Sequence, residues 1–289
     1  MRWGVASVVL FILCLQLPPS GGAAAPSGDF VVAIWRGVGP SRNLDLALVS
    51  GEGPLRPRFL TRVGVDDHSP SWSPDGRQIV FARRGARRGG IYVLRASTTI
   101  RLTHGAGDAA PTYSPDGRRI AFSRAPPRSP TEPSRFAHLV VMRADGRGQH
   151  VIVRTRYPAR QINWSADGKQ LFYSDNDVLR TVEVASAAVR QLGVHGHRPT
   201  LSPDGSRIAY LAPGEPGPFY RDLNWGIYVA DSSGANPLRV TDGQFGPLSW
   251  SADGERLLVT NGRSLAFVDV RSGAMRPLGL AGSGGAFKP

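Results

Sequence analysis

The sequence predicts an all-β protein, a six-bladed β-propeller built from four-stranded antiparallel blades. Two observations lead to this fold class. A stretch reading PSWSPDGRQIVFAR, at residues 70–83, returns in four further copies along the chain. Two more strand-like runs follow each copy, and no apolar pattern of helical period competes with them after residue 25. One repeat is therefore expected to form one blade of four strands.

The spacing of the copies supports this prediction. Their anchoring positions are separated by 41, 51, 37 and 49 residues. Irregular spacing around about 40 to 45 residues is typical of a propeller blade that carries loop insertions. The anchors are Trp72, Tyr113, Trp164, Leu201 and Trp250.

Each copy has the chemistry of two strands joined by a tight turn. In the first copy Pro74 supplies a fixed φ, Asp75 can bond its own backbone, and Gly76 tolerates a left-handed conformation. This order is typical of a three-residue hairpin loop with a glycine bulge. The aromatic anchor before the turn is suited to wedge between neighbouring sheets.

Three strand-like runs precede the first copy, at residues 30–36, 44–49 and 58–62. They supply the last three strands of a sixth unit, which lacks its innermost strand and would leave a sheet edge unpaired. We expect the tail, residues 285–289, to complete or shield this edge. Residues 26–289 then form a single propeller domain.

Residues 1–25 are predicted to be a secretory signal peptide. Arg2 is followed by an apolar run at residues 5–17 and by Ala23-Ala24-Ala25. The run is too short to span a bilayer, so no membrane span is expected, although a retained amphiphilic anchor is the alternative. The protein is expected to be secreted, in the periplasm or outside the cell.

The formal net charge of +13 comes almost entirely from arginine, because only Lys169 and Lys288 are lysines. Such a charge suits an acidic partner, for example an anionic polymer of the cell envelope. The arginines are scattered along the chain, which is typical of a solvated basic surface. A nucleic-acid ligand, which would require them to form one face, is therefore not expected.

No motif of a serine hydrolase, zinc peptidase, thiol redox site or phosphate loop occurs in the sequence. Asp175-Asn176-Asp177 lacks the glycine and the distal glutamate of a calcium loop, and it falls where a turn between two strands is due. We therefore expect a turn there, and neither a cofactor nor a bound metal.

The repeat resembles the WD-repeat-like propeller units of TolB, the periplasmic component of the Tol–Pal envelope system. The resemblance covers essentially the whole chain after the signal and implies the propeller fold. TolB carries an α/β domain ahead of its propeller. Peptidases of the prolyl-oligopeptidase type share the repeat and carry a hydrolase domain. Neither additional domain is expected in this chain. The matching residues are Pro70, Trp72 to Gly76, Ile79, Phe81, Ile91-Tyr92-Val93 and Arg101-Leu102-Thr103.

Candidate binding residues come from one mouth of the propeller channel. The loops that lead into the innermost strands ring this mouth, and the insertions at residues 123–137 and 212–226 are expected on the same face. The second insertion combines aromatic residues with arginine, as binding hot spots do. The candidates are Asp67, His68, Asp108, Arg160, His197, Tyr220, Arg221 and Trp225.

The sequence thus predicts a secreted, monomeric, non-enzymatic scaffold. It would bind a protein or an acidic polymer through the channel-mouth face, and truncating Trp225 or Arg160 is expected to weaken binding with little change in melting temperature. The alternative is a propeller enzyme, a hydrolase or polysaccharide lyase, with a metal or histidine site at the mouth. His68 and His197 are expected to lie too far apart to share one metal.

Overall fold

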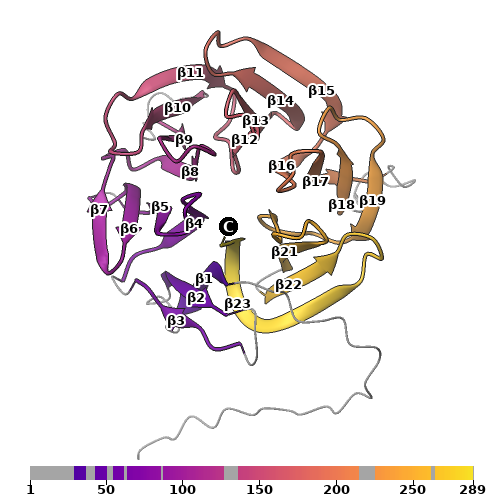
Figure 1. Ribbon diagram of the computed structural model, residues 1–289, viewed down its shortest axis with the longest axis horizontal. Helices are drawn as coiled ribbons and strands as arrows, with labels where there is room; N and C mark the ends of the chain where they lie inside the picture. The colour runs from indigo at the N-terminus through magenta and orange to yellow at the C-terminus, as the bar shows by residue number, and fades with distance from the viewer. Residues whose placement is uncertain are drawn as a thin grey trace, which may run out of the picture.

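The computed structural model describes residues 29–36, 43–50, 55–61, 64–85, 87–126, 136–214, 225–261 and 264–288. These residues form a β-propeller of four-stranded antiparallel blades, arranged around a central axis (Figure 1). The described part of the chain contains strands and turns only. No described segment forms a helix long and apolar enough to cross a membrane.

Four blades are separate sheets whose strands follow chain order outward from the axis (Figure 1). The first contains β4 (Asp67–Trp72), β5 (Gln78–Arg83), β6 (Gly90–Arg95) and β7 (Thr98–Arg101). The second contains β8 (Asp108–Tyr113), β9 (Arg119–Arg124), β10 (Ala137–Arg143) and β11 (His150–Thr155). The third contains β12 (Asn163–Trp164), β13 (Gln170–Asp175), β14 (Val178–Glu183) and β15 (Val189–His195). The fourth contains β16 (His197–Leu201), β17 (Arg207–Pro213), β18 (Trp225–Asp231) and β19 (Leu238–Asp242).

The remaining strands form one continuous seven-stranded sheet, in the order β20-β21-β22-β23-β1-β2-β3. Its central strand β23 runs from the outer rim toward the axis (Figure 1). The first part of β23 pairs with β22, and its last part pairs with β1. The strands are β20 (Ser249–Trp250), β21 (Arg256–Asn261), β22 (Ser264–Asp269), β23 (Met275–Phe287), β1 (Phe30–Arg36), β2 (Asn43–Val49) and β3 (Arg58–Phe59).

The prediction that the tail completes the first unit is confirmed for its described residues. Gly285, Ala286 and Phe287 lie opposite Val32, Val31 and Phe30 of β1. Glycine is required for this close approach, because a Cβ at position 285 would lie 2.4 Å from the Val31 carbonyl oxygen. The tail therefore supplies the innermost strand that the first unit lacks.

The repeated turns have the predicted chemistry. In the first copy the Ser73 hydroxyl donates to Asp75 Oδ1 at 2.6 Å, the backbone N–H of Arg77 donates to the same oxygen at 3.1 Å, and Gly76 has a φ of 64°. In the fourth copy the hydroxyls of Ser202 and Ser206, with the Ser206 N–H, lower the pKa of Asp204 to about 2. The serine-to-aspartate bond recurs from Ser114, Ser165, Ser202 and Ser251.

Hydrophobic clusters join neighbouring blades, and the aromatic anchors take part as predicted. Trp164 packs with Ala121 and Leu139 of the preceding blade, and its indole N–H donates to the Thr112 carbonyl at 3.3 Å. Trp250 makes the corresponding bond to the Thr200 carbonyl at 3.0 Å. The core of the protein is therefore distributed between the sheets.

An arginine at the start of the second strand secures the following blade. The guanidinium of Arg119 lies 4.7 Å from the Trp164 ring and donates to the Gly168 carbonyl at 2.9 Å. Arg207 repeats both contacts with Trp250, at 4.8 Å, and with the Gly254 carbonyl, at 2.7 Å. At the ring closure the ammonium of Lys288 takes this place, 5.8 Å from the Trp72 ring.

Candidate binding site at the channel mouth

The sequence had suggested that the mouth residues lie in loops before the innermost strands, but all of those described except Arg160 lie at the start of the strands themselves. Asp67 is the first residue of β4, Asp108 of β8 and His197 of β16, whereas Arg160 precedes β12. Each innermost strand ends at its serine–aspartate turn. The mouth residues therefore lie at the end of the channel opposite to the turns.

One pocket of about 650 Å³ opens at this mouth, between the β12–β15 and β16–β19 blades. We call it the mouth pocket. It brings together three of the predicted residues, Arg160, His197 and Trp225, and its volume lies in the range of small-ligand sites. The residues that line it are Tyr157, Pro158, Arg160, Ser174, Asn176, Asp177, His197, Arg198, Leu211, Trp225, Gln244 and Phe245.

His197 is held from two sides. Its ring stacks on Trp225, with centroids 5.2 Å apart and an interplanar angle of 24°. Its Nε2 lies 3.1 Å from Asp177 Oδ1. Burial lowers the pKa of His197, and the nearby Asp177 acts against that shift. The imidazole is therefore neutral at neutral pH and donates its Nε2–H to the carboxylate.

Trp225 also has a packing role that the sequence did not indicate. It begins β18 opposite Pro213 of β17, which brings it beside His197 at the mouth. It packs against the buried cluster that contains Leu248 and Trp250. Truncation of Trp225 is therefore expected to lower stability as well as binding, unlike the sequence-based expectation.

Two arginines lie in the mouth pocket. Arg160 is exposed and Arg198 is partly buried, and neither side chain makes a hydrogen bond or ion pair with any residue that the structure describes. Burial, together with the positive charge of Arg160, lowers the pKa of Arg198 to about 10. The pocket is therefore lined by two guanidinium groups whose charges oppose each other.

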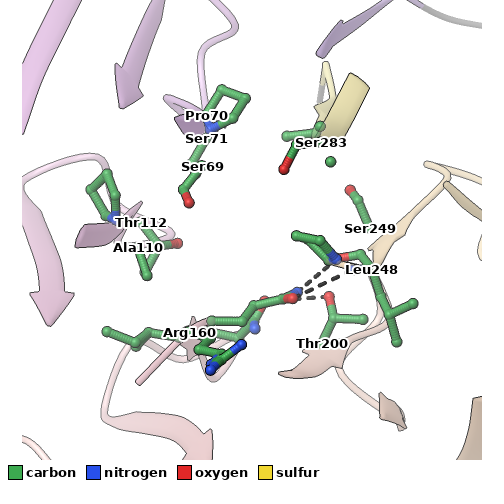
Figure 2. A pocket seen from close by; sticks show the side chains of 18 residues that line it. Ser69, Pro70, Ser71, Ala110, Thr112, Arg160, Thr200, Leu248, Ser249 and Ser283 are labelled. Carbon is green, nitrogen blue, oxygen red and sulfur yellow. Dashed lines mark hydrogen bonds between the residues drawn. The ribbon is translucent and has the colours of Figure 1, made fainter. Parts of the chain in front are cut away.

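A second cavity of about 160 Å³ lies in the channel itself (Figure 2). Short side chains line it, among them Ser69, Ala110, Thr200 and Ser283. Arg160 lines both this channel cavity and the mouth pocket, so it lies where the two spaces meet.

Gln161 crosses the channel beside Arg160. Its Nε2 donates to the Leu248 carbonyl at 2.7 Å, and its Oε1 accepts from the Leu248 N–H at 3.4 Å. The two residues are 87 positions apart in the sequence. This pair of bonds ties the segment before β12 to the segment before β20, past the β16–β19 blade that lies between them in the ring.

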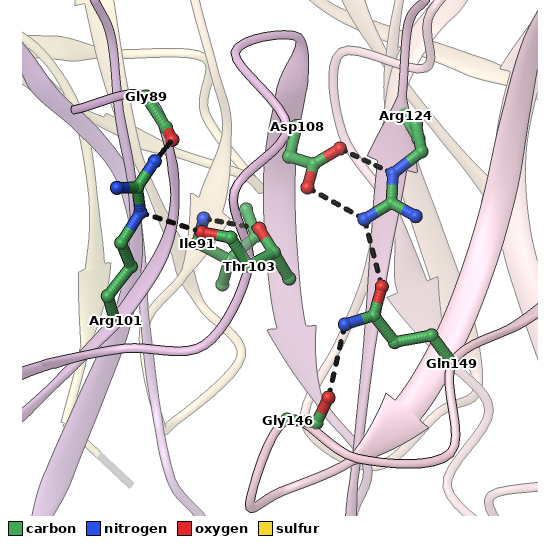
Figure 3. A network of polar contacts seen from close by, with 8 residues as sticks. All are labelled: Gly89, Ile91, Arg101, Thr103, Asp108, Arg124, Gly146 and Gln149. Atoms are coloured by element: carbon green, nitrogen blue, oxygen red, sulfur yellow. Dashed lines mark hydrogen bonds and ion pairs between the residues drawn. The ribbon is translucent and has the colours of Figure 1, made fainter. Parts of the chain in front are cut away.

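Asp67 and Asp108 are occupied within their own blades. Asp67 is fully buried and accepts from Arg83 Nε at 2.6 Å and from Nη2 at 2.9 Å. Asp108 is paired in the same way with Arg124, at 2.7 and 2.9 Å, and Arg124 also donates to Gln149 (Figure 3). These carboxylates join the first and second strands of their blades, and neither lines the mouth pocket.

His68 likewise lies outside the mouth pocket. Its Nδ1 is 3.1 Å from the Ser69 hydroxyl, and burial lowers the pKa of His68 to about 4. It is therefore neutral at neutral pH. Among the described residues, no group of three histidine, cysteine, aspartate or glutamate side chains is placed to hold a metal ion.

The remaining predicted residues, Tyr220 and Arg221, lie outside the described part of the chain. The turn predicted at Asp175-Asn176-Asp177 is confirmed, since Asn176 and Asp177 have φ of 51° and 64° and connect β13 to β14. Positive φ at both central residues is the geometry of a two-residue hairpin turn.

Sequence reasoning missed Arg198, Gln161 and Asp177. A signal for Arg198 was present in the repeat. It lies three residues before its anchor, where two other copies have Ser69 and Ala110. All three have a positive φ, between 51° and 53°, at an irregularity of the innermost strand. The third and fifth copies have Gln161 and Pro247 there, so Arg198 is the one charged residue at this position of the five copies, and that was the available indication.

The comparisons with known proteins agree with this geometry. The family model described as the TolB beta propeller domain matches residues 59–212, more than half of the chain. No curated protein sequence matches the chain.

Solved structures share the fold. The crystal structure of TolB from Acinetobacter baumannii matches with a TM-score of 0.76 and 19% identity, over 92% of this chain and 67% of that one. A putative TolB from Agrobacterium tumefaciens gives 0.62 and 16%, over 90% and 91% of the two chains. An oligogalacturonate lyase from Vibrio parahaemolyticus gives 0.57 and 14%, over 81% and 71%. The predicted resemblance is confirmed: this chain belongs to the TolB β-propeller family.

Proposed function

We propose that this protein is a non-enzymatic binding scaffold that holds a protein or an acidic polymer of the cell envelope or extracellular space at its channel mouth. The observation that carries the proposal is the mouth pocket, where Arg160, His197 and Trp225 meet. Arginine and tryptophan are enriched among the residues that dominate binding energy. His197 and Trp225 lie on strands, which fix their positions while the pocket leaves them reachable.

The scaffold that we propose has six blades. The seven-stranded sheet then counts as two blades that share β23, one ending in β20 and one in β3. Phe30 of β1 packs edge-on against Phe267 of β22, with ring centroids 5.6 Å apart. Such contact is expected between two blades that face each other, and a hydrophobic cluster of β1, β2, β21 and β22 residues fills the space between them.

We further propose that the protein is exported and works as a monomer. The support for export is the order of basic, apolar and small residues in positions 1–25, together with the family to which the chain belongs. Mass spectrometry of the secreted protein should give a first residue between Ala24 and Pro26. A cell-retained chain that begins at Met1 would contradict export.

A protein or acidic polymer is a better ligand than nucleic acid for the described surface. Several arginines are engaged within the protein itself: Arg83 and Arg124 in ion pairs, and Arg119 and Arg207 between blades. These residues do not contribute to a free basic face of the kind that nucleic-acid binding requires.

The test is capture of a partner from an envelope extract by the mature protein, with binding then measured on the purified partner. Arg160→Ala should weaken binding by roughly thirtyfold, the equivalent of about 2 kcal/mol. Arg118, exposed beside the turn on the opposite face, supplies the matched control, and Arg118→Glu should bind normally. Normal binding by Arg160→Ala with loss in Arg118→Glu would place the binding face on the other side.

A propeller enzyme, a hydrolase or polysaccharide lyase, is the second candidate. One observation favours it: a carboxylate, Asp177, orients the neutral imidazole of His197 beside Arg160, an arrangement that suits a general base. Release of unsaturated products from acidic oligosaccharides, lost in His197→Ala, would establish the enzyme and overturn the scaffold. Stoichiometric, tightly bound metal in the purified protein would also favour the enzyme.

A further inference from the structure

Arg198 occupies a repeated position of the propeller. The corresponding Ser69 and Ala110 line the channel cavity, and each, like Arg198, has a left-handed backbone at the irregularity of its innermost strand. Three of the five copies thus share this conformation, and Arg198 differs from the other two in its long, charged side chain. A long cation at this position extends from the channel wall into the mouth pocket.

Arg198 and Arg160 lie close enough for each charge to oppose the other. Their mutual repulsion, added to the burial of Arg198, lowers the pKa of Arg198. No described residue accepts a hydrogen bond from either guanidinium. Elsewhere in the described structure a buried or partly buried arginine has a partner, as Arg83 has with Asp67 and Arg124 with Asp108. Within the described residues, no bonded partner therefore offsets the positive charge of the pair in the mouth pocket.

The carboxylate that lines the mouth pocket does not neutralise this pair. Asp177 accepts its bond from His197, at 3.1 Å, and its side chain is 69% exposed. Solvent screens a carboxylate in that position. A guanidinium offers a planar fork of donors that fits carboxylate and phosphate oxygens, and two such forks next to each other define a place for one anionic group.

We propose that Arg160 and Arg198 form a binding site for a single carboxylate or phosphate group, presented by a ligand that enters the mouth pocket. This inference rests on the proposed function, since it assigns the chemistry by which the mouth recognises its partner. The stacked rings of His197 and Trp225 form the wall beside the anion, and Arg160 places it at the junction with the channel. The anionic group belongs to a free small molecule or to the end of a larger acidic chain.

The experiment titrates the mature protein with inorganic phosphate and with citrate at constant ionic strength, by calorimetry and by thermal shift. Either probe should bind saturably, and Arg198→Gln and Arg160→Gln should each weaken binding at least tenfold. Arg118→Gln, on the turn face, is the matched control and should bind like the wild type. Preference for phosphate or for citrate separates the two oxygen chemistries. Chains of oligoglutamate that bind more tightly than glutamate alone would identify an extended acidic ligand.

A second measurement does not depend on the ligand. Because Arg198 is partly buried without a described partner, ligand-free Arg198→Gln should melt at the same temperature as the wild type or higher. A lower melting temperature would overturn the claim that this charge is uncompensated. The anion site is overturned if neither phosphate nor citrate binds saturably. It is also overturned if the wild type and both variants bind the probes with equal affinity.

The outcomes also separate this inference from the proposed function. Partner capture that survives Arg198→Gln and Arg160→Gln, together with no anion binding, would refute the anion site. It would leave the scaffold standing with a different recognition surface. Anion binding that depends on both arginines, without any partner, would keep the site and refute the scaffold.

Discussion

The ion pair of Asp67 and Arg83 provides a quantitative test of what the mouth aspartates do. Asp67→Ala leaves the Arg83 guanidinium without its two bonds, and this side chain is only 8% exposed. Burial raises the pKa of Asp67, and the bonds from Arg83 act against that shift, so each charge depends on the other inside the blade. Removal of one member of such a pair costs about 3–5 kcal/mol, because the other charge stays buried.

The second blade contains the matched control. Asp108→Ala frees Arg124, but this side chain is 34% exposed and keeps its bond to Gln149 at 3.0 Å. The loss is therefore about 2 kcal/mol, the value of hydrogen bonds to charged groups. In melting temperature the two changes correspond to decreases of about 10 °C and about 5 °C for a domain of this size.

Urea unfolding followed by tryptophan fluorescence gives both losses in unfolding free energy. This requires that the slope of the free energy against urea concentration is the same in the wild type and the variants. The double variant Asp67→Leu with Arg83→Met should recover most of the loss, because no buried charge remains. Ligand binding at the mouth should be unaffected in all these variants. The reasoning fails if Asp108→Ala is as destabilising as Asp67→Ala, or if Asp67→Ala abolishes binding while the protein stays folded.

Three further predictions concern the turns, the ring closure and the channel. Since the folded pKa of Asp204 is about 2, below the usual value of about 4, its ionised form stabilises the protein above pH 4, and this contribution disappears as the pH falls from about 4 to 2. The melting-temperature difference between wild type and Asp204→Asn should vanish over that interval. A difference that does not change with pH would contradict the lowered pKa of Asp204. Deletion of residues 283–289 should destabilise the protein by at least about 3 kcal/mol. Phe287→Ala should cost a large part of that amount, because the phenyl ring is buried against β1 and β22. Unchanged unfolding curves would show that the propeller closes without the tail. Gln161→Ala should cost about 1–3 kcal/mol, because the N–H and carbonyl of Leu248 lose their partners inside the channel; no loss would mean that the cross-channel bonds contribute nothing.

The hairpins of the fold could be predicted because their causes are local. Proline, aspartate and glycine in fixed order specify each turn, and the apolar runs on both sides specify the strands. The closure by the tail is not local, yet it followed from counting strands, because one unit was one strand short.

The ends of some strands could not be predicted, because tertiary bonds decide them. The run at residues 58–62 was expected to be a strand, but β3 ends at Phe59. The N–H of Leu60 and the N–H of Thr61 both point to the Leu46 carbonyl, at 2.8 and 3.4 Å, and the Thr61 hydroxyl accepts from the Leu46 N–H. A side chain thus replaces the backbone partner and ends the ladder early.

The candidate site was predicted only in part, because tertiary bonds also decide which side chains at the mouth remain available to a ligand. Arg160, His197 and Trp225 were placed on one face by topology, and the structure brings them to one pocket. Asp67 and Asp108 were placed on that face too, but their arginine partners follow 16 residues later in both blades, across the hairpin. That common spacing in the sequence indicates a structural ion pair.

Positions that obey the repeat and positions that break it carry different information. Serine, aspartate and glycine recur in all five copies because each hairpin needs the same turn, whereas the aromatic anchor recurs in four copies and the arginine contact with the next blade is made by Arg119 and Arg207. At the mouth the repeat is broken: Arg198 and Gln161 stand where Ser69 and Ala110 stand in other copies, and Gln161 bonds to Leu248, past the intervening blade. A blade has no structural need for an arginine at such a position, since small residues serve there in two other blades. The side chain is therefore best explained by what enters the pocket, and variants at these irregular positions are the ones that should alter binding while the fold remains.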